Sequence, residues 1–214
     1  MVARKISKLI NEDKSININE YDSIFARIKN SKTEKDLKII AAEYDLNLIE
    51  HKYPRLGLKI SAEEIILLKE SKVLSTDIDN NLTINQNYLN PIAKLLYALV
   101  WKQGDLQKLK KIIQGIEEVE NPKLDKPEGL VFYCFGNHLA NPNNYPIIDQ
   151  HVIRALNLYN DNSKCDSLRK SDKVSLVERD NYLKWFREFK NVDSNFLYLL
   201  DRILFEIGRT VKLK

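Results

Sequence analysis

The sequence is poor in the residues that most often interrupt regular structure or cross-link a chain. Of its 214 residues, only six are Gly, six are Pro and two are Cys. So few turn residues disfavour a many-stranded sandwich or a Gly-rich nucleotide fold, and they favour a mostly helical chain. The two cysteines, Cys134 and Cys165, cannot form a disulfide framework or a four-thiolate cluster. We therefore expect a helical protein of the reducing cytoplasm.

Long apolar runs and a strong excess of one charge are also absent. The longest strongly apolar stretch, Leu95 to Trp101, is far too short to span a bilayer. The opening Met-Val-Ala-Arg-Lys leads into charged residues without the apolar core of a signal peptide. We expect no membrane association. The formal net charge of +4 permits a nucleic-acid partner but does not require one.

Apolar residues recur at helical spacing along most of the chain, which predicts an all-α fold. Helices are predicted over residues 23–30, 34–44, 65–74, 92–100, 106–116 and 182–189, in addition to a C-terminal one. Ser61-Ala-Glu-Glu64 is a capping-box pattern, Pro91 suits a first helical turn, and Asp105 can cap the helix that follows it. The clearest stripe follows a cap at Asp193 or Ser194 and comprises Phe196, Leu199, Leu200, Ile203, Leu204, Ile207 and Val211.

A polar stretch rich in Asp and Asn, from Thr76 to Asn87, separates the predicted helices into two groups. We therefore predict two domains, an N-terminal helical lobe over residues 1–88 and a second helical region over residues 89–214. Within the first lobe, Lys52 to Ile60 could form a short strand.

The sequence contains no complete metal-binding or nucleotide-binding motif. Asp77 to Tyr88 begins like a calcium loop, but Leu82 stands where Gly is needed and Tyr88 where a bidentate Glu is needed. Cys134 and His138 share a helix face, yet zinc needs three or four ligands, so a buried Cys beside a hydrogen-bonded His is favoured. There is no P-loop, G-x-G-x-x-G or G-x-S-x-G motif. We expect no metal and no cofactor.

The stretch from Leu130 to Leu156 carries the most information. It reads as an apolar helix that ends near Gly136 or Asn137, a loop, and a new helix that begins at Asp149. As an N-cap, the Asp149 carboxylate accepts backbone N–H groups and meets the positive end of the helix dipole, which should hold it ionised. Taken alone, this pattern describes a simple helix cap.

The segment Ile148-Asp-Gln-His-Val-Ile-Arg154 resembles the Val-Asp-Thr-His-Val-x-Arg signature of the helix-hairpin-helix DNA glycosylases, the endonuclease III-like superfamily. The resemblance covers Pro91 to Leu156, with about seven specific residues. It implies a two-lobed orthogonal helical bundle, with residues 89–214 as the glycosylase-like core. In that family the signature Asp is catalytic, starts a helix and follows a helix ending in Phe-Gly, an order that Phe135-Gly136 and Asp149 reproduce.

The resemblance also implies an activity and a partner. The activity is DNA base excision by an N-glycosylase, a hydrolase that carries lyase chemistry in some members, and the partner is double-stranded DNA. Asp149 is the catalytic candidate, and Lys126 is the candidate Schiff-base nucleophile.

The candidate nucleic-acid contacts are Lys102 and Gln103, at a helix end, and His151 and Arg154, after Asp149. His151 can equally pack against or cap a helix, and Arg154 can be structural. Tyr133, Phe135 and Trp101 could line a base pocket.

One departure from the family pattern leaves two alternatives open. The family's hairpin carries a Gly-x-Gly that lets backbone amides approach a DNA phosphate, and Asn121 to Gly129 lacks it. A non-catalytic DNA-binding or interaction protein that keeps the fold would explain this loss. In a helical protein without a nucleic-acid role, Asp149 would only cap its helix.

Overall fold

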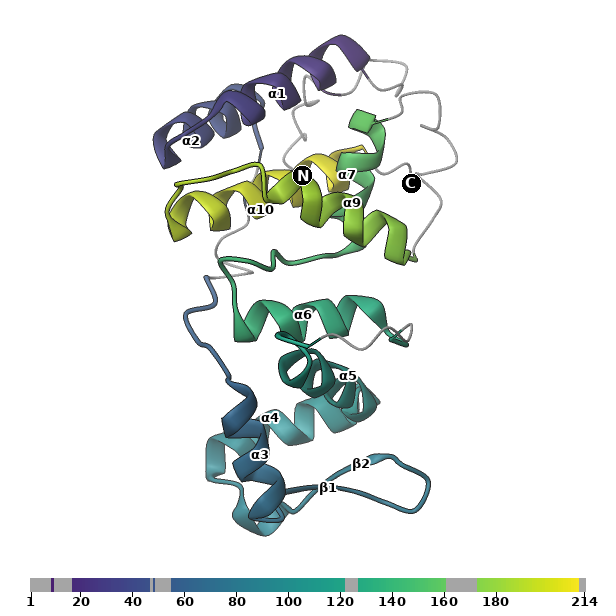
Figure 1. Ribbon diagram of the computed structural model, residues 1–214. Helices are drawn as coiled ribbons and strands as arrows, with labels where there is room; N and C mark the ends of the chain where they lie inside the picture. The colour runs from purple at the N-terminus through teal and green to yellow at the C-terminus, as the bar shows by residue number, and fades with distance from the viewer. Residues whose placement is uncertain are drawn as a thin grey trace, which may run out of the picture. The chain divides into compact units, whose positions relative to one another are not determined.

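The computed structural model describes residues 9, 17–46, 48, 55–121, 127–160 and 173–211. Their secondary structure is mostly helical, with one small two-stranded sheet, which confirms the all-α prediction. The chain divides into two compact units, Met1–Leu56 with Ile148–Lys214, and Gly57–Ile147 (Figure 1). The sequence-based boundary was instead expected at residues 88 and 89. Residues 57–88 group with the segment that follows them because α3 (Ala62–Glu70) and β2 (Leu82–Ile84) pack on α5 (Leu106–Glu117).

The first unit is built from both ends of the chain. Its helices among the described residues are α1 (Ile18–Asn30), α2 (Glu34–Glu43), α7 (Gln150–Asn160), α9 (Leu176–Phe186) and α10 (Ser194–Thr210). The long helix α10 packs against α7 and α2, and α7 also contacts α1 and α9. The predicted apolar stripe of α10 faces this core, where Phe196, Leu200 and Ile203 are buried. The predicted cap is confirmed, since Asp193 accepts from the Phe196 amide at 2.7 Å.

The second unit is one continuous stretch of chain. It contains α3 (Ala62–Glu70), β1 (Leu74–Thr76), β2 (Leu82–Ile84), the 3₁₀ helix η1 (Gln86–Tyr88), α4 (Pro91–Lys102), α5 (Leu106–Glu117) and α6 (Leu130–Ala140). The Ser61 capping box and Pro91 in the first turn of α4 are confirmed. Asp105 precedes α5 but makes no side-chain cap, because its carboxylate pairs with Lys108 instead. Residues 55–60 form no strand, and 51–54 lie outside the described residues.

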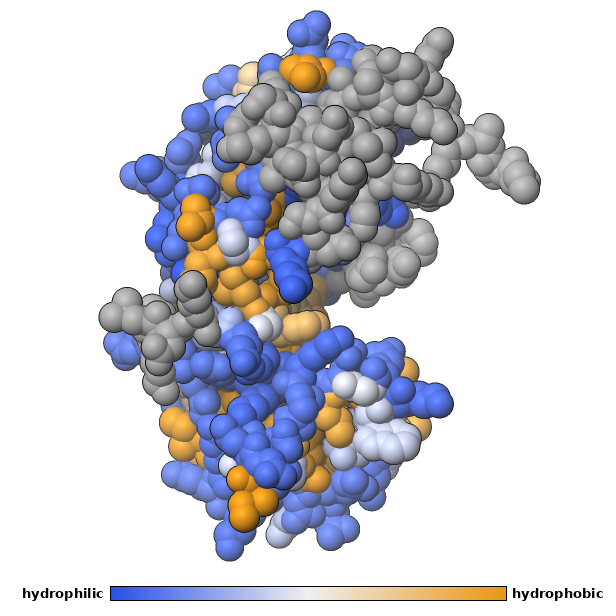
Figure 2. Space-filling view, turned by 90° about the vertical axis from the view of Figure 1, so that its right-hand side faces the viewer, coloured by the Kyte–Doolittle hydropathy of each residue, from blue (hydrophilic) through white to orange (hydrophobic). Residues whose placement is uncertain are grey.

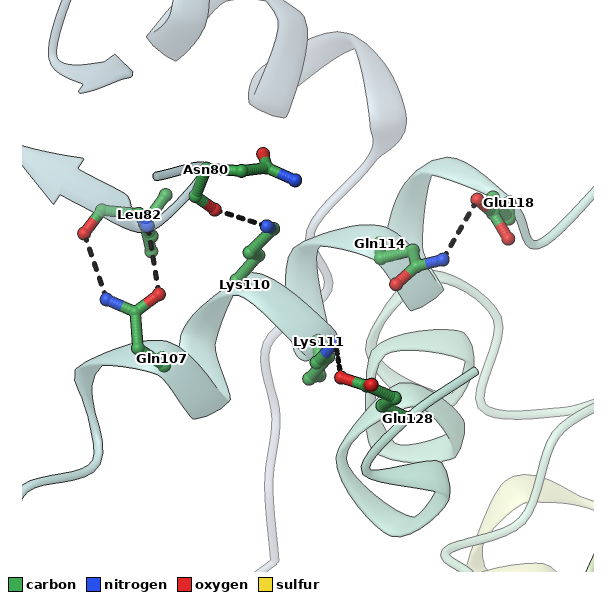
Figure 3. Close-up of polar contacts among 8 residues, drawn as sticks. All are labelled: Asn80, Leu82, Gln107, Lys110, Lys111, Gln114, Glu118 and Glu128. Atoms are coloured by element: carbon green, nitrogen blue, oxygen red, sulfur yellow. Dashed lines mark hydrogen bonds and ion pairs between the residues drawn. The ribbon is translucent and has the colours of Figure 1, made fainter. Parts of the chain in front are cut away.

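The polar stretch after residue 73 folds as a β-hairpin, which the sequence analysis does not predict. β1 and β2 are antiparallel, and Ser75 pairs with Thr83. Asp77 closes the turn by accepting from the Asn81 amide at 2.8 Å. Gln107 of α5 holds β2 through both backbone groups of Leu82, at 2.9 and 3.3 Å, and Lys110 donates to the Asn80 carbonyl (Figure 3). The hairpin is therefore a fixed part of this unit.

These contacts predict the effect of removing Gln107. Gln107→Ala should cost about 1 kcal/mol of unfolding free energy and accelerate hydrogen exchange at the Leu82 amide, because two hydrogen bonds are lost. Gln114→Ala is the matched control on the same helix, since among the described residues its side chain bonds only Glu118, at 3.3 Å (Figure 3). Unchanged exchange at Leu82 in Gln107→Ala would show that Gln107 does not hold the hairpin.

Two glycines set the approach of α5 to α6. A Cβ at Gly115 would lie 2.0 Å from the Tyr133 carbonyl oxygen, and one at Gly136 would lie 2.1 Å from that of Ile112. Asn137 donates across the same contact to the Gly115 carbonyl at 2.7 Å. The prediction that the helix ends near Gly136 is therefore wrong. Gly136 lies inside α6, and its role is to permit close packing between the two helices.

Candidate functional site

The candidate site centres on Asp149 at the start of α7. Its Oδ1 accepts hydrogen bonds from the backbone amides of His151 and Val152, at 2.7 and 2.8 Å, and its carbonyl accepts from the Ile153 amide at 3.1 Å. This is the N-cap predicted from the sequence. No described residue donates a hydrogen bond to Oδ2. One carboxylate oxygen is thus fixed by the helix, and the other accepts no hydrogen bond from the described residues.

Burial changes the acidity of this carboxyl group. Asp149 is largely buried, and its desolvation raises its pKa above the ordinary value, despite the opposing hydrogen bond from the Val152 amide and the positive charge of Arg154. The sequence analysis expects the cap to hold the carboxylate ionised. The hydrogen bonds at the helix start do lower the pKa, but the loss of hydration has the larger effect and the pKa is raised.

The raised pKa predicts a pH dependence of stability. The folded chain binds the Asp149 proton more tightly than the unfolded chain, so stability decreases as pH rises from the ordinary carboxyl pKa through the raised one. Asparagine does not titrate and caps a helix as well as aspartate. Asp149→Asn should therefore remove this decrease and raise the unfolding free energy near pH 7.

Urea unfolding of both proteins from roughly pH 4 to pH 8 measures this difference. The two stability curves should converge at the acid end, where the wild-type carboxyl group is protonated. A variant that is less stable than the wild type at neutral pH would mean that the charged carboxylate has a net stabilising role.

Arg154 and His151 connect α7 to α10. Arg154 is only 2% exposed; its Nη1 donates to the Gly208 carbonyl at 3.1 Å and lies 2.9 Å from His151 Nδ1. Because a guanidinium can only donate, Nδ1 of His151 is the acceptor in this contact. The His151 ring also meets Phe205 edge-on, with centroids 5.0 Å apart. Such burial does not fit a direct phosphate contact by Arg154 and fits its structural alternative.

The structure also contains a polar pair that the sequence does not predict, Tyr182 and Asp201. Tyr182 of α9 is fully buried, and its hydroxyl donates to Asp201 of α10 at 2.6 Å. Burial raises the pKa of Tyr182 well above its ordinary value, and the charges of Asp201 and Asp149 add to this effect. Tyr182 is thus a neutral phenol at physiological pH. Its helical spacing predicts only a core aromatic residue, and nothing in the sequence pairs it with Asp201.

The other candidate residues lie elsewhere. Lys102 is the last residue of α4 and Gln103 is its C-cap; both are exposed and belong to the Gly57–Ile147 unit. Lys126 lies outside the described residues. Among the aromatic candidates for a base pocket, Tyr133 is buried with its hydroxyl 3.4 Å from Glu118, Phe135 is partly buried, and Trp101 is exposed. The structure therefore brings Asp149, His151 and Arg154 together on one helix.

The pair Cys134 and His138 has the arrangement that the sequence analysis favours. Cys134 is buried and forms no disulfide, and His138 Nδ1 bonds the Tyr145 carbonyl at 2.8 Å. Burial lowers the pKa of His138, which favours a neutral ring. Within the described parts of the chain, no group of three or more His, Cys, Asp or Glu side chains could hold a metal ion. No helix there is both long and apolar enough to cross a membrane.

Comparisons with known proteins give no further guide. No protein-family model matches the sequence, and neither the curated proteins nor the solved structures include a match to this chain. The geometry at Asp149 and the signature around it are thus the observations from which a function can be inferred.

Proposed function

We propose that the protein is a DNA base-excision N-glycosylase in which Asp149 is the catalytic residue. The proposal rests on the different contacts of the two Asp149 carboxylate oxygens. Oδ1 is fixed by two amides of α7, while Oδ2 accepts no hydrogen bond from the described residues. A helix cap needs only the first oxygen, so the second is free to act on a substrate. The position of Asp149 at a helix start, inside the signature that the segment resembles, supports the same role.

The chemistry follows from a carboxylate held close to a sugar. The damaged or mispaired base leaves the duplex and enters a pocket, and the bond between its nitrogen and the sugar C1′ breaks. The electron pair leaves with the base, and the positive charge that develops on the sugar is stabilised by Asp149. Water adds its oxygen to C1′ and gives up one proton, and the departing base gains one. With Lys126 as the nucleophile, the amine would replace water in a lyase.

The remaining residues have supporting roles in this proposal. Lys102 and Gln103 are exposed at the end of α4 and would contact the backbone of double-stranded DNA. Arg154 and His151 would hold the start of α7 in place against α10. The hydrolysis uses water and needs neither a metal nor a cofactor. We place the reaction in the cytoplasm, in agreement with the scarcity of cysteine.

The direct test is base release from duplex oligonucleotides that carry a single modified base. A panel of deaminated, oxidised, alkylated and mispaired bases should include at least one substrate, with the free base detected by chromatography. Trapping with borohydride separates the lyase from the simple glycosylase, because only an amine forms a reducible Schiff base. Failure to release any base across the panel would overturn the enzyme proposal.

A second candidate is a non-catalytic DNA-binding protein that retains the fold. It is favoured by the absence of Gly-x-Gly between Asn121 and Gly129 and by the burial of Arg154, which removes one phosphate contact. This candidate predicts salt-dependent duplex binding that Asp149→Asn leaves unchanged, without base release.

A further inference from the structure

A cavity of about 520 Å³ lies beside α4 in the Gly57–Ile147 unit. This volume falls within the range typical of small-molecule sites. The cavity is formed between η1 and one face of α4, and its polar and aromatic lining residues are Gln86, Asn87, Lys94, Tyr97 and Trp101. These residues take no part in the site around Asp149, which belongs to the other unit.

Local structure explains why these side chains meet. Lys94, Tyr97 and Trp101 are spaced by three and four residues, so they share one face of α4. Asn90 caps this helix by accepting from the Ala93 amide at 2.8 Å, directly after η1. The side chain of Gln86 approaches across the cavity, with Nε2 3.4 Å from the Tyr97 hydroxyl. The cavity is thus built from residues 86–101 alone.

The helix leaves its apolar and aromatic side chains unusually exposed. No residue of α4 is buried, and Trp101 is 63% exposed. Figure 2 shows hydrophobic patches among the hydrophilic side chains of the Gly57–Ile147 unit, in the lower part of the view. Folding of this unit does not account for an exposed indole at a cavity wall. An indole and a phenol on one helix face are suited to stacking against a planar ring.

The charge of the cavity lining indicates the charge of its ligand. Its lining includes Lys94 but no Asp or Glu. Within the described parts of the chain, no carboxylate lies within ion-pair distance of Lys94. The Gln86 and Asn87 side chains add amide donors and acceptors at the wall formed by η1. The complementary ligand therefore combines a planar, hydrogen-bonding ring with a negatively charged group.

We propose that this cavity binds a nucleotide unit. The base stacks on Trp101 and Tyr97, the phosphate pairs with Lys94, and the amides of Gln86 and Asn87 contact the base edge. A free mononucleotide and an unpaired nucleotide within single-stranded DNA present the same chemistry. The proposal goes beyond the glycosylase activity and does not depend on it, because none of these residues touches Asp149.

Calorimetric titration of the full chain with dTMP, AMP and a single-stranded oligo(dT) tests the proposal. At least one should bind with a Kd below about 1 mM. Trp101→Ala should weaken this binding about tenfold or more, because a base loses its stacking surface. Lys94→Glu should weaken it by a similar factor. Binding of the mononucleotides identifies a free nucleotide as the ligand, and binding of the oligonucleotide alone identifies single-stranded DNA.

Two matched controls lie outside the cavity. Leu95→Ala truncates a side chain of α4 that is 69% exposed, and Lys59→Glu reverses an exposed charge in the same unit. Both should bind within about twofold of the wild type, since neither residue lines the cavity. Asp149→Asn should bind normally even if base release is lost. Absence of binding by all three ligands, or equal binding by Trp101→Ala and the wild type, would overturn the proposal.

Discussion

Asp149→Asn should reduce single-turnover base release by about two to three orders of magnitude while helix α7 stays folded. A carboxylate that stabilises developing charge contributes on this scale when it is the only such group in a site. Asparagine has the same shape and accepts the same amide hydrogen bonds from His151 and Val152, so the cap is retained. What the substitution removes is the negative charge on the oxygen that the helix does not use.

Asp193→Asn is the matched control for this experiment. Asp193 caps α10 through the Phe196 amide at 2.7 Å, as Asp149 caps α7, but it is exposed and remote in sequence from the signature. It should leave base release unchanged. The rates are compared on the substrate found in the lesion panel, with circular dichroism to verify folding. Full activity in Asp149→Asn, or an equal loss in both variants, would contradict a catalytic role for Asp149.

The second large effect concerns the contact between α7 and α10. A Cβ at Gly208 would lie 1.8 Å from the His151 carbonyl oxygen, and both atoms belong to packed helices. Gly208→Ala must therefore separate the helices or bend one of them. We expect it to lower the free energy of unfolding by about 3 kcal/mol, the upper part of the range for overpacked cores. The Arg154 hydrogen bond to the Gly208 carbonyl would be strained by the same movement.

Urea unfolding of Gly208→Ala and of Gly57→Ala measures this effect against a neutral glycine. A Cβ at Gly57 meets nothing within 4 Å, so that variant should change stability by no more than about 0.5 kcal/mol. A cost below about 1 kcal/mol for Gly208→Ala would indicate that the helices adjust easily and that their close approach does not position Asp149.

Local signals in the sequence predict much of this fold. Caps at Ser61, Asp149 and Asp193 depend on residues within three positions along the chain, and all three are confirmed. The stripe of α10 is also confirmed, because a strong apolar period requires a buried face. Helix α4 has equally apolar residues at helical spacing, but these are exposed, which shows that periodicity alone does not supply a packing partner.

Contacts between distant residues account for what the sequence does not predict. β1 and β2 have three residues each in a polar stretch, and their pairing is completed by Gln107, 25 residues after Leu82. The pairing of Tyr182 with Asp201 joins two helices and has no local pattern. Likewise, the raised pKa of Asp149 results from burial by surrounding structure, whereas the sequence displays only the cap.

The order of the two units along the chain has a consequence for protein synthesis. The Gly57–Ile147 unit interrupts the other one, so α1 and α2 leave the ribosome long before α7 and α10, the helices on which they pack. The interrupted unit can fold only after α10 has been synthesised, whereas the continuous unit can fold once Ile147 has emerged. A ribosome stalled once Ile147 has left the exit tunnel should therefore carry a protease-resistant middle segment and a protease-sensitive beginning.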